Sequence, residues 1–191
     1  APSGRENSIR DIIEKNLKSC CDEIFTDTLG NLICHKKGNG KKIMFCAHMD
    51  EVGFMVTGIT DKGYIKFTSC GGIDTRVIVS KRVRIGDNKI PGVIGYKAVH
   101  LQGGDEHKKA AEEKNLSVDI GAKDKEEAEK YVSVGDYATF ESDFVSFGQD
   151  GRTIKAKAID DRVGCAVMMD IIKQELPVDC WFAFTVQEEV G

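Results

Sequence analysis

Apolar residues at helical spacing predict the first element of the chain. The stretch Ser3-Gly4-Arg5-Glu6 has the pattern of a capping box, and it precedes apolar positions that repeat as on one helix face: Ile9, Ile12, Ile13 and Leu17. We therefore expect a helix over residues 5–19. The turn signal Thr28-Leu29-Gly30 follows between two β-like runs, which predicts short strands over 23–27 and 31–35.

Two further patterns predict strands in the first third of the chain. Residues 42–47 are apolar on both faces, which is typical of a buried strand in a parallel sheet. Residues 52–60 and 64–68 are β-like and are joined by Asp61-Lys62-Gly63, the signature of a hairpin. The chain therefore begins as an alternation of helix and strands.

The middle of the chain has a different pattern of predicted elements. From about residue 70 to 151, short β-like segments are separated by turns rich in Gly and Asp, which predicts a small β-rich insertion. The β-α rhythm then returns, with a strand over 153–159, a helix over 162–174 and a strand over 179–186. We expect an α/β fold in two parts, residues 1–68 and 152–191, interrupted by the insertion at 69–151.

Composition narrows the class of protein. The 191 residues include 27 Lys and Arg against 31 Asp and Glu, a net charge of −4 that predicts no nucleic-acid partner. No apolar run reaches the roughly 18–20 residues that span a bilayer, and residues 1–5 lack the apolar stretch of a signal peptide. The sequence has seven cysteines and no Cys-x-x-Cys pair, and some of them, such as Cys46 and Cys165, lie in apolar runs. This pattern favours buried, reduced thiols in a cytoplasmic protein.

Three clusters of polar residues each lie directly after a predicted strand or between a predicted strand and the next helix. His48-Met49-Asp50-Glu51 comes directly after the strand over 42–47, and Asp160-Asp161-Arg162 lies between a strand and the next helix. Gln187-Glu188-Glu189 follows the last strand. Because ligands of open α/β sheets bind beyond the carboxyl ends of the strands, we expect the three clusters to meet at one edge of the sheet.

The residue types in these clusters suggest a metal site. One imidazole with several carboxylates favours Zn²⁺, Co²⁺ or Mn²⁺ over Mg²⁺ or Ca²⁺. Asp50 shares a strand face with His48 and could orient its ring, and in a Glu-Glu pair one carboxylate can bind metal while the other serves as general base. The same residues also fit a structural histidine, a helix cap at Asp160 or Asp161, and a solvated loop. The remaining histidines are expected to be structural or to lie in loops: His35, His100 and His107.

The clusters, read with their neighbours, resemble the motifs of the M42 metallo-aminopeptidases, a family that includes glutamyl and deblocking aminopeptidases. The motifs are residues 47–53 (AHMDEVG), 158–165 (AIDDRVGC) and 185–191 (TVQEEVG). The resemblance extends from Asp27-Thr28-Leu29-Gly30-Asn31 to the last residue. It implies a zinc-peptidase-like mixed sheet flanked by helices, interrupted by a β-barrel-like insertion domain of the dimerisation type, and therefore a homo-oligomer.

The resemblance also implies roles for individual residues. His48 would ligate one divalent ion, Asp160 would bridge two, and Glu189 would ligate the second. Glu188 would be the general base, and Asp50 would support His48. The peptide bond after the bridging Asp160 would be cis. The implied reaction is hydrolysis of peptides at a free N-terminus.

The family pattern requires two more ligands, an Asp and a His, on the C-terminal side of the Glu-Glu motif. The sequence ends at Gly191, so each ion would keep two protein ligands, fewer than the three or four of typical zinc sites. We therefore expect an incomplete aminopeptidase with little or no activity as it stands. Two alternatives remain open at this point: another two-metal hydrolase such as a deacylase, and a non-catalytic assembly protein.

Overall fold

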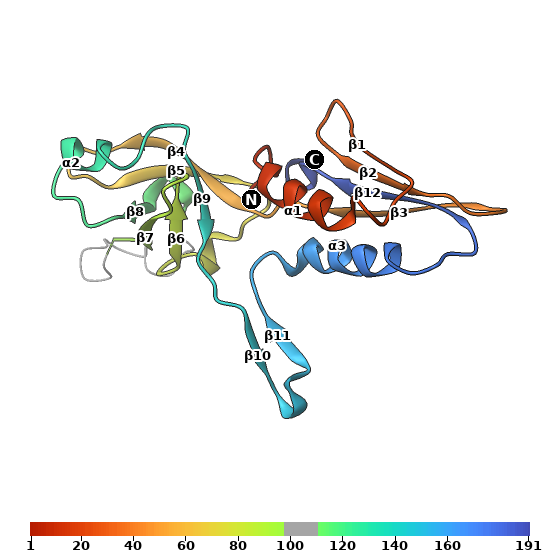
Figure 1. Ribbon diagram of the computed structural model, residues 1–191. Helices are drawn as coiled ribbons and strands as arrows, with labels where there is room; N and C mark the ends of the chain where they lie inside the picture. The colour runs from red at the N-terminus through yellow and green to blue at the C-terminus, as the bar shows by residue number, and fades with distance from the viewer. Residues whose placement is uncertain (98–110) are drawn as a thin grey trace. The chain divides into compact units, whose positions relative to one another are not determined.

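The chain folds into two compact units (Figure 1). The computed structural model describes residues 1–97 and 111–191. The first unit comprises residues 1–51 and 158–191, and the second comprises residues 52–157. His100 and His107, which were expected in loops, lie outside the described residues. Within the described part, no helix is both long enough and apolar enough to cross a membrane.

The first unit is built on a mixed sheet of four strands, in the order β1-β2-β12-β3. Strand β12 is parallel to β3 and antiparallel to β2. The elements of this unit are α1 (Asn7–Leu17), β1 (Glu23–Thr26), β2 (Leu32–Lys36), β3 (Lys42–His48), α3 (Ile159–Ile172) and β12 (Asp179–Thr185). The expected α/β class with a mixed sheet is confirmed.

Helix α1 is confirmed, but its start is not a capping box. The N-cap residue is Glu6, and its side chain makes no capping hydrogen bond. Ser3 and Glu6 are both buried and direct their side chains to other segments of the chain. The two residue types that form a capping box in a free helix are therefore used for tertiary contacts here.

Strand β3 is parallel as predicted, but it is not buried. It lies at the edge of the described sheet, so one side of the strand has no strand neighbour there. Ile43 and Met44 are 40% and 59% exposed, and Cys46 is exposed as well. Apolar character alone cannot distinguish a central strand from an edge strand, which is why the predictions for these residues were wrong. Cys165, in contrast, is buried as expected.

The core of the first unit lies between the sheet and its helices. Helices α1 and α3 (Figure 1) contact one another, and both helices contribute to one apolar cluster with β2 and β12. Phe182 on the central strand β12 is fully buried and stacks on Phe45 of β3, with ring centroids 5.1 Å apart. Burial of this cluster holds the carboxyl ends of β3 and β12 in register.

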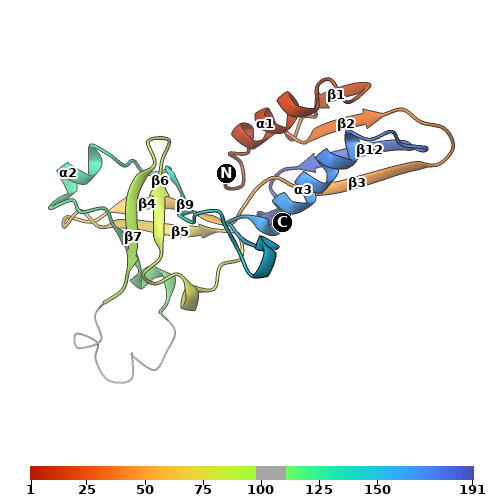
Figure 2. The same ribbon diagram turned by 60° about the horizontal axis from the view of Figure 1, so that its bottom comes forward.

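The second unit is built on a closed barrel of six described strands, in the order β4-β5-β8-β7-β6-β9. Figure 2 labels β4, β5, β6, β7 and β9 of this barrel. Its aromatic centre is Phe54, which packs edge-on against Phe67 and Phe140. The strands of the barrel are β4 (Gly53–Ile59), β5 (Ile65–Cys70), β6 (Arg82–Ile85), β7 (Ile90–Gly95), β8 (Ser117–Asp119) and β9 (Tyr137–Phe140). The described part of this unit also holds helix α2 (Lys125–Glu129) and the short 3₁₀ turns Thr75–Val77, Glu113–Asn115 and Gln149–Gly151.

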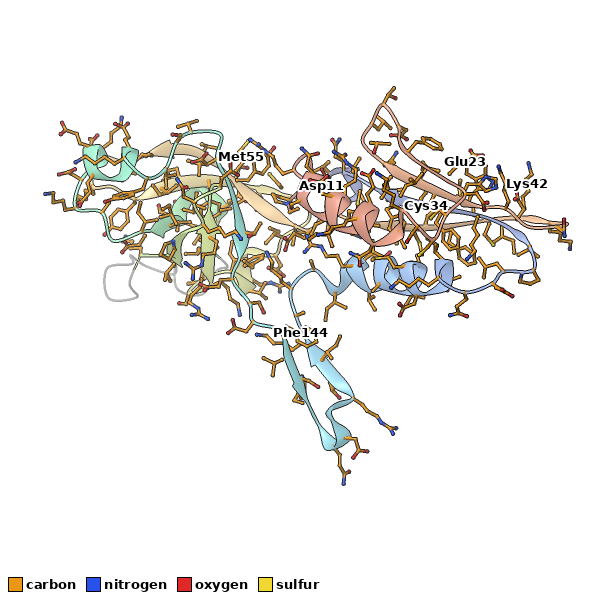
Figure 3. The ribbon with its side chains drawn as sticks, viewed as in Figure 1. Asp11, Glu23, Cys34, Lys42, Met55 and Phe144 are labelled. Atoms are coloured by element: carbon orange, nitrogen blue, oxygen red, sulfur yellow. The ribbon has the colours of Figure 1, made fainter. Side chains whose placement is uncertain are left out.

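The limits of the two units differ from the segment limits expected from the sequence. The predicted hairpin over 52–68 is confirmed as β4 and β5, but both strands pair within the barrel and not with the first sheet. The predicted strand over 153–159 is the shorter β11 (Thr153–Lys155), which pairs only with β10 (Val145–Phe147) among the described strands. Phe144, at the start of this hairpin, is exposed (Figure 3).

Candidate metal centre

The parallel pairing of β3 and β12 brings two of the polar clusters together. His48 is the last residue of β3 and lies opposite Thr185, the last residue of β12. The N–H of Met49 donates to the Thr185 carbonyl at 2.8 Å, which keeps the two chains together beyond the strands. The segments 48–51 and 186–189 therefore leave the sheet side by side, as the sequence predicted.

His48 is the centre of the candidate site. Its side chain is buried, and its Nε2 atom lies 3.1 Å from Asp160 Oδ1 and 3.8 Å from Glu188 Oε2. Burial lowers the pKa of the imidazole, but the hydrogen bond to Asp160 and the charges of Asp50 and Glu188 outweigh it, so the pKa of His48 is raised. Asp160 and Glu188, which lie 112 and 140 positions after His48 in the sequence, are thus both close to the same imidazole nitrogen.

Asp160 reaches this nitrogen from the start of α3 and not from the end of a strand in the first sheet. The preceding strand, β11, belongs to the separate hairpin, so the expectation of three strand ends was correct for two clusters only. The Asp160–Asp161 peptide bond is cis, as expected, and both residues have non-helical backbone angles. Asp161 Oδ1 accepts the Gly164 N–H at 3.2 Å, so the interpretation as a helix cap applies to Asp161.

Asp50 is fully buried and holds several groups at once. It accepts hydrogen bonds from Ser3 Oγ at 2.6 Å and from the N–H groups of Glu188 and Glu189 at 3.2 and 3.1 Å. Burial raises the pKa of this carboxyl, but these hydrogen bonds outweigh burial and leave the pKa below its ordinary value. Its Oδ1 atom lies 3.4 Å from His48 Nδ1, an ion-pair distance without a hydrogen bond, so the buried Nδ1 has no hydrogen-bond partner among the described residues.

The two glutamates lie in a 3₁₀ turn, Glu188–Val190, that follows β12. Gln187 precedes the turn with a φ of 59°, in the left-handed region. Burial raises the pKa of Glu189; His48 lowers it, and the nearby carboxylates, of which Asp50 is the strongest, raise it further. Glu189 thus lies within electrostatic reach of the other residues of the site.

The donor set fits a divalent metal in type. One imidazole nitrogen and several carboxylates converge. The neighbouring carboxylates raise the pKa of Glu189, a repulsion that a bound cation would relieve. The carboxylates of Asp160 and Glu188 are 91% and 62% exposed, so a ligand can reach them from solvent. No group of three or more His, Cys, Asp or Glu in the described part of the chain is already arranged to hold a metal ion.

Several residues around the site were not predicted from the sequence as site residues. Arg162 donates from Nε to the Met49 carbonyl and from Nη2 to Glu51 Oε1, both at 3.3 Å, and so ties α3 to the segment after β3. Ser3 and Glu6 were assigned to a capping box, and Asn31 to a turn-and-strand motif. The signal that could have found them is the occurrence of polar residues in segments that must be largely buried against the sheet.

Comparison with known proteins places the chain in a family. The family model described as M42 glutamyl aminopeptidase matches residues 30–191. A relative from Acetivibrio thermocellus, assigned as an aminopeptidase, is 46% identical over 191 residues, which is 99% of this chain and 55% of the relative. The chain thus spans about half the length of the curated relatives that it matches.

Solved structures agree with this comparison. A TET aminopeptidase from the marine sediment archaeon Thaumarchaeota archaeon SCGC AB-539-E09 superimposes with a TM-score of 0.94 at 37% identity, over 100% of this chain and 56% of that one. The Pyrococcus horikoshii TET1 peptidase, described as assembling into a tetrahedron or a large octahedral shell, gives 0.86 at 37% identity, over 100% of this chain and 58% of that one. The chain therefore belongs to the M42 glutamyl aminopeptidase family.

Proposed function

We propose that this chain carries part of the active site of a metal-dependent aminopeptidase, which hydrolyses the first peptide bond of peptides with a free N-terminus. The observation that supports the proposal most is the meeting of His48, Asp160 and Glu188 beside the ends of two parallel strands. Membership of the family supports the reaction class. The open position of the carboxylates supports access by a peptide.

In this proposal His48, Asp160 and Glu189 would hold two divalent ions, Zn²⁺, Co²⁺ or Mn²⁺, with Asp160 as the ligand common to both. When bound, such ions polarise the scissile carbonyl and lower the pKa of a water molecule. The carboxylate of Glu188 accepts a proton from the attacking water and passes it to the leaving amine. Asp50 keeps the ring of His48 and the turn of Glu188 and Glu189 in place, because it contacts both.

Assembly and compartment are also part of the proposal. The shell described for the Pyrococcus horikoshii peptidase supports a homo-oligomer for the whole protein. The cysteines of this chain are free thiols, which is the state that the cytoplasm maintains. We therefore propose a cytoplasmic oligomer that acts on peptides.

The ligand count predicts weak metal binding by these residues alone. His48 with Asp160, and Asp160 with Glu189, give two protein ligands for each ion, whereas zinc sites use three or four. We expect the 191 residues by themselves to bind Zn²⁺ or Co²⁺ weakly and to show little aminopeptidase activity. We expect a chain extended through the part that the relatives carry beyond the match to bind two ions and to release the aniline from an aminoacyl-anilide.

Calorimetric titration of both chains with Zn²⁺ and Co²⁺, together with the anilide assay, tests this proposal. In the extended chain, Glu188→Gln should abolish activity while metal still binds, and Glu189→Gln should weaken metal binding as well. The matched control is Glu175→Gln, an exposed glutamate in the same unit. Failure of the extended chain to bind metal would refute the metal centre, and cleavage of acylated substrates only would indicate a deacylase.

A further inference from the structure

The turn that carries Glu188 and Glu189 is held almost entirely by side chains. Four successive backbone N–H groups, from Val186 to Glu189, each donate to a side-chain oxygen of a distant segment. The acceptors and distances are Asn31 Oδ1 at 2.9 Å, Glu6 Oε1 at 3.0 Å, Asp50 Oδ1 at 3.2 Å and Asp50 Oδ2 at 3.1 Å. Three separate segments of the first unit thus determine where this turn lies.

Glu6 is the contact from the start of α1. The residue is 4% exposed, and its Oε1 atom accepts the N–H groups of both Gly4, at 2.9 Å, and Gln187. A carboxylate that receives two backbone N–H groups away from water has little freedom to move. Glu6 therefore fixes Gln187, the left-handed residue that directs the chain into the turn.

Asn31 is the contact from the turn between β1 and β2. Its Nδ2 atom donates to Asp27 Oδ2 at 2.8 Å, which leaves its Oδ1 atom directed at the Val186 N–H. Asp27 in turn accepts the N–H groups of Leu29, Gly30 and Asn31 on its other oxygen, at 2.9–3.0 Å. Asp27 therefore sets the orientation of the Asn31 amide.

Ser3 does not contact the turn of Glu188 and Glu189 through its hydroxyl but acts on it indirectly, through Asp50. Its hydroxyl is buried and donates to Asp50 Oδ2, the oxygen that also accepts the Glu189 N–H. The backbone of the same segment lies along the loop after β3, since Pro2 and Glu51 form a parallel bridge and the Glu51 N–H donates to the Ala1 carbonyl. The hydroxyl thus keeps the Asp50 carboxylate turned towards the glutamate turn.

We propose that Glu6, Asn31 and Ser3 are positioning residues that hold the turn after β12 and thereby set the direction of Glu188 and Glu189. These contacts are needed because the carboxylates of Asp50, Asp160 and Glu188 repel that of Glu189, and an unrestrained turn would let them move apart. The proposal gives a common purpose to the Ser-Gly-Arg-Glu and Asp-Thr-Leu-Gly-Asn motifs. Its relevance to catalysis rests on the proposed function, whereas the contacts themselves do not.

Amide hydrogen exchange, measured by NMR on the ¹⁵N-labelled chain without metal, tests the proposal. In the unchanged chain the amides of Val186 to Glu189 should be protected. Glu6→Ala should speed exchange at Gln187 by roughly tenfold, because a hydrogen bond to a charged acceptor is lost. Asn31→Ala should do the same at Val186, and Ser3→Ala should act at Glu188 and Glu189.

The conservative variants Glu6→Gln and Ser3→Thr keep an acceptor or a hydroxyl and should restore most of the protection. Asp11→Ala is the matched control, since Asp11 is exposed on the same helix (Figure 3). The amides of Phe182 and Phe184 in β12 should exchange as before in every variant. If they accelerate equally in Glu6→Ala, that variant is unfolding globally. The comparison is then made with Glu6→Gln, in which Gln187 should exchange slightly faster than in the unchanged chain while the β12 amides stay as they were.

Two results would overturn the proposal: unprotected amides at 187–189 in the unchanged chain, or protection at Gln187 that neither Glu6 variant alters. Co²⁺ titration of the same variants in the extended chain separates this inference from the proposed function. Binding by the unchanged extended chain that weakens several-fold in Glu6→Ala and recovers in Glu6→Gln supports the positioning role. Absence of Co²⁺ binding in every extended chain would refute the metal centre, while the exchange data would still decide the positioning role.

Discussion

Asp50 is the single residue that connects most of the candidate centre. It lies next to His48 and accepts the amides of Glu188 and Glu189, so one carboxylate joins the imidazole to the glutamate turn. The sequence places Asp50 on the same face as His48 because the two residues are two positions apart. Its contact with the turn depends on the pairing of β3 with β12, which no local pattern contains.

Asp27 offers a test at a single residue. The side-chain hydrogen bond from Asn31 is the main reason that the pKa of Asp27 lies below its ordinary value, with three backbone N–H groups adding to it. Because the folded pKa is the lower one, its contribution to stability is complete above the unfolded pKa of about 3.9 and is lost as the pH falls through the folded pKa.

We therefore expect Asp27→Asn to lower the free energy of unfolding at about pH 6, and the difference from the unchanged chain to shrink towards about pH 3. Urea titrations at several pH values measure it. Asp170→Asn, an exposed aspartate on α3, is the control. A difference that stays constant with pH would show that the charge of Asp27 is not what stabilises the turn.

Among the secondary-structure elements, β12 supports the fold and the site together. It is the only described strand of the first sheet that pairs with both β2 and β3, and Phe182 at its centre is fully buried. Loss of a buried phenylalanine removes apolar burial and leaves a cavity, which costs about 3–5 kcal/mol.

We expect Phe182→Ala to lower the free energy of unfolding of the first unit by about that amount, as measured by urea denaturation followed by NMR signals from both units. Phe147→Ala serves as the control, because Phe147 is half exposed in the β10–β11 hairpin and its loss should cost less than about 0.5 kcal/mol. Equal effects of the two substitutions would contradict the assignment of Phe182 to the core.

At the scale of the whole molecule, the described residues form two separate apolar cores. The apolar cluster around Phe54 lies entirely within residues 52–157, and the cluster around Phe182 lies entirely in the rest of the chain. The second unit is also one continuous stretch of sequence, and the described strands of its barrel form a closed sheet without an open edge.

We expect residues 52–157, produced alone, to fold and to unfold cooperatively within about 5 °C of the corresponding transition in the whole chain. Circular dichroism during heating measures the transition. The control is Phe54→Ala in the isolated unit, which should lower the transition temperature strongly. A gradual, non-cooperative loss of signal would show that the barrel depends on the first unit.

Much of this arrangement could be predicted locally. Helix α1, the β4–β5 hairpin, and the positions of His48 at the end of one strand and Glu188 after another follow from periodicity and turn residues, since these signals depend on neighbours in the chain. The exposure of Met44 could not be predicted, because an apolar strand has the same pattern at the edge and in the middle of a sheet. The assignment of β4 and β5 to the barrel likewise depends on their pairing partners.

The sequence by itself determined the class of fold, the order of the elements and the residue types that could bind metal. Only the tertiary structure decided which of them meet: Asp160 with His48, and Glu6 with Gln187, which are 181 residues apart. The reason is physical. A capping pair and a positioning pair have the same local sequence, and the buried environment of the sheet selects between them, because each buried hydrogen-bonding group must find a partner wherever the fold provides one.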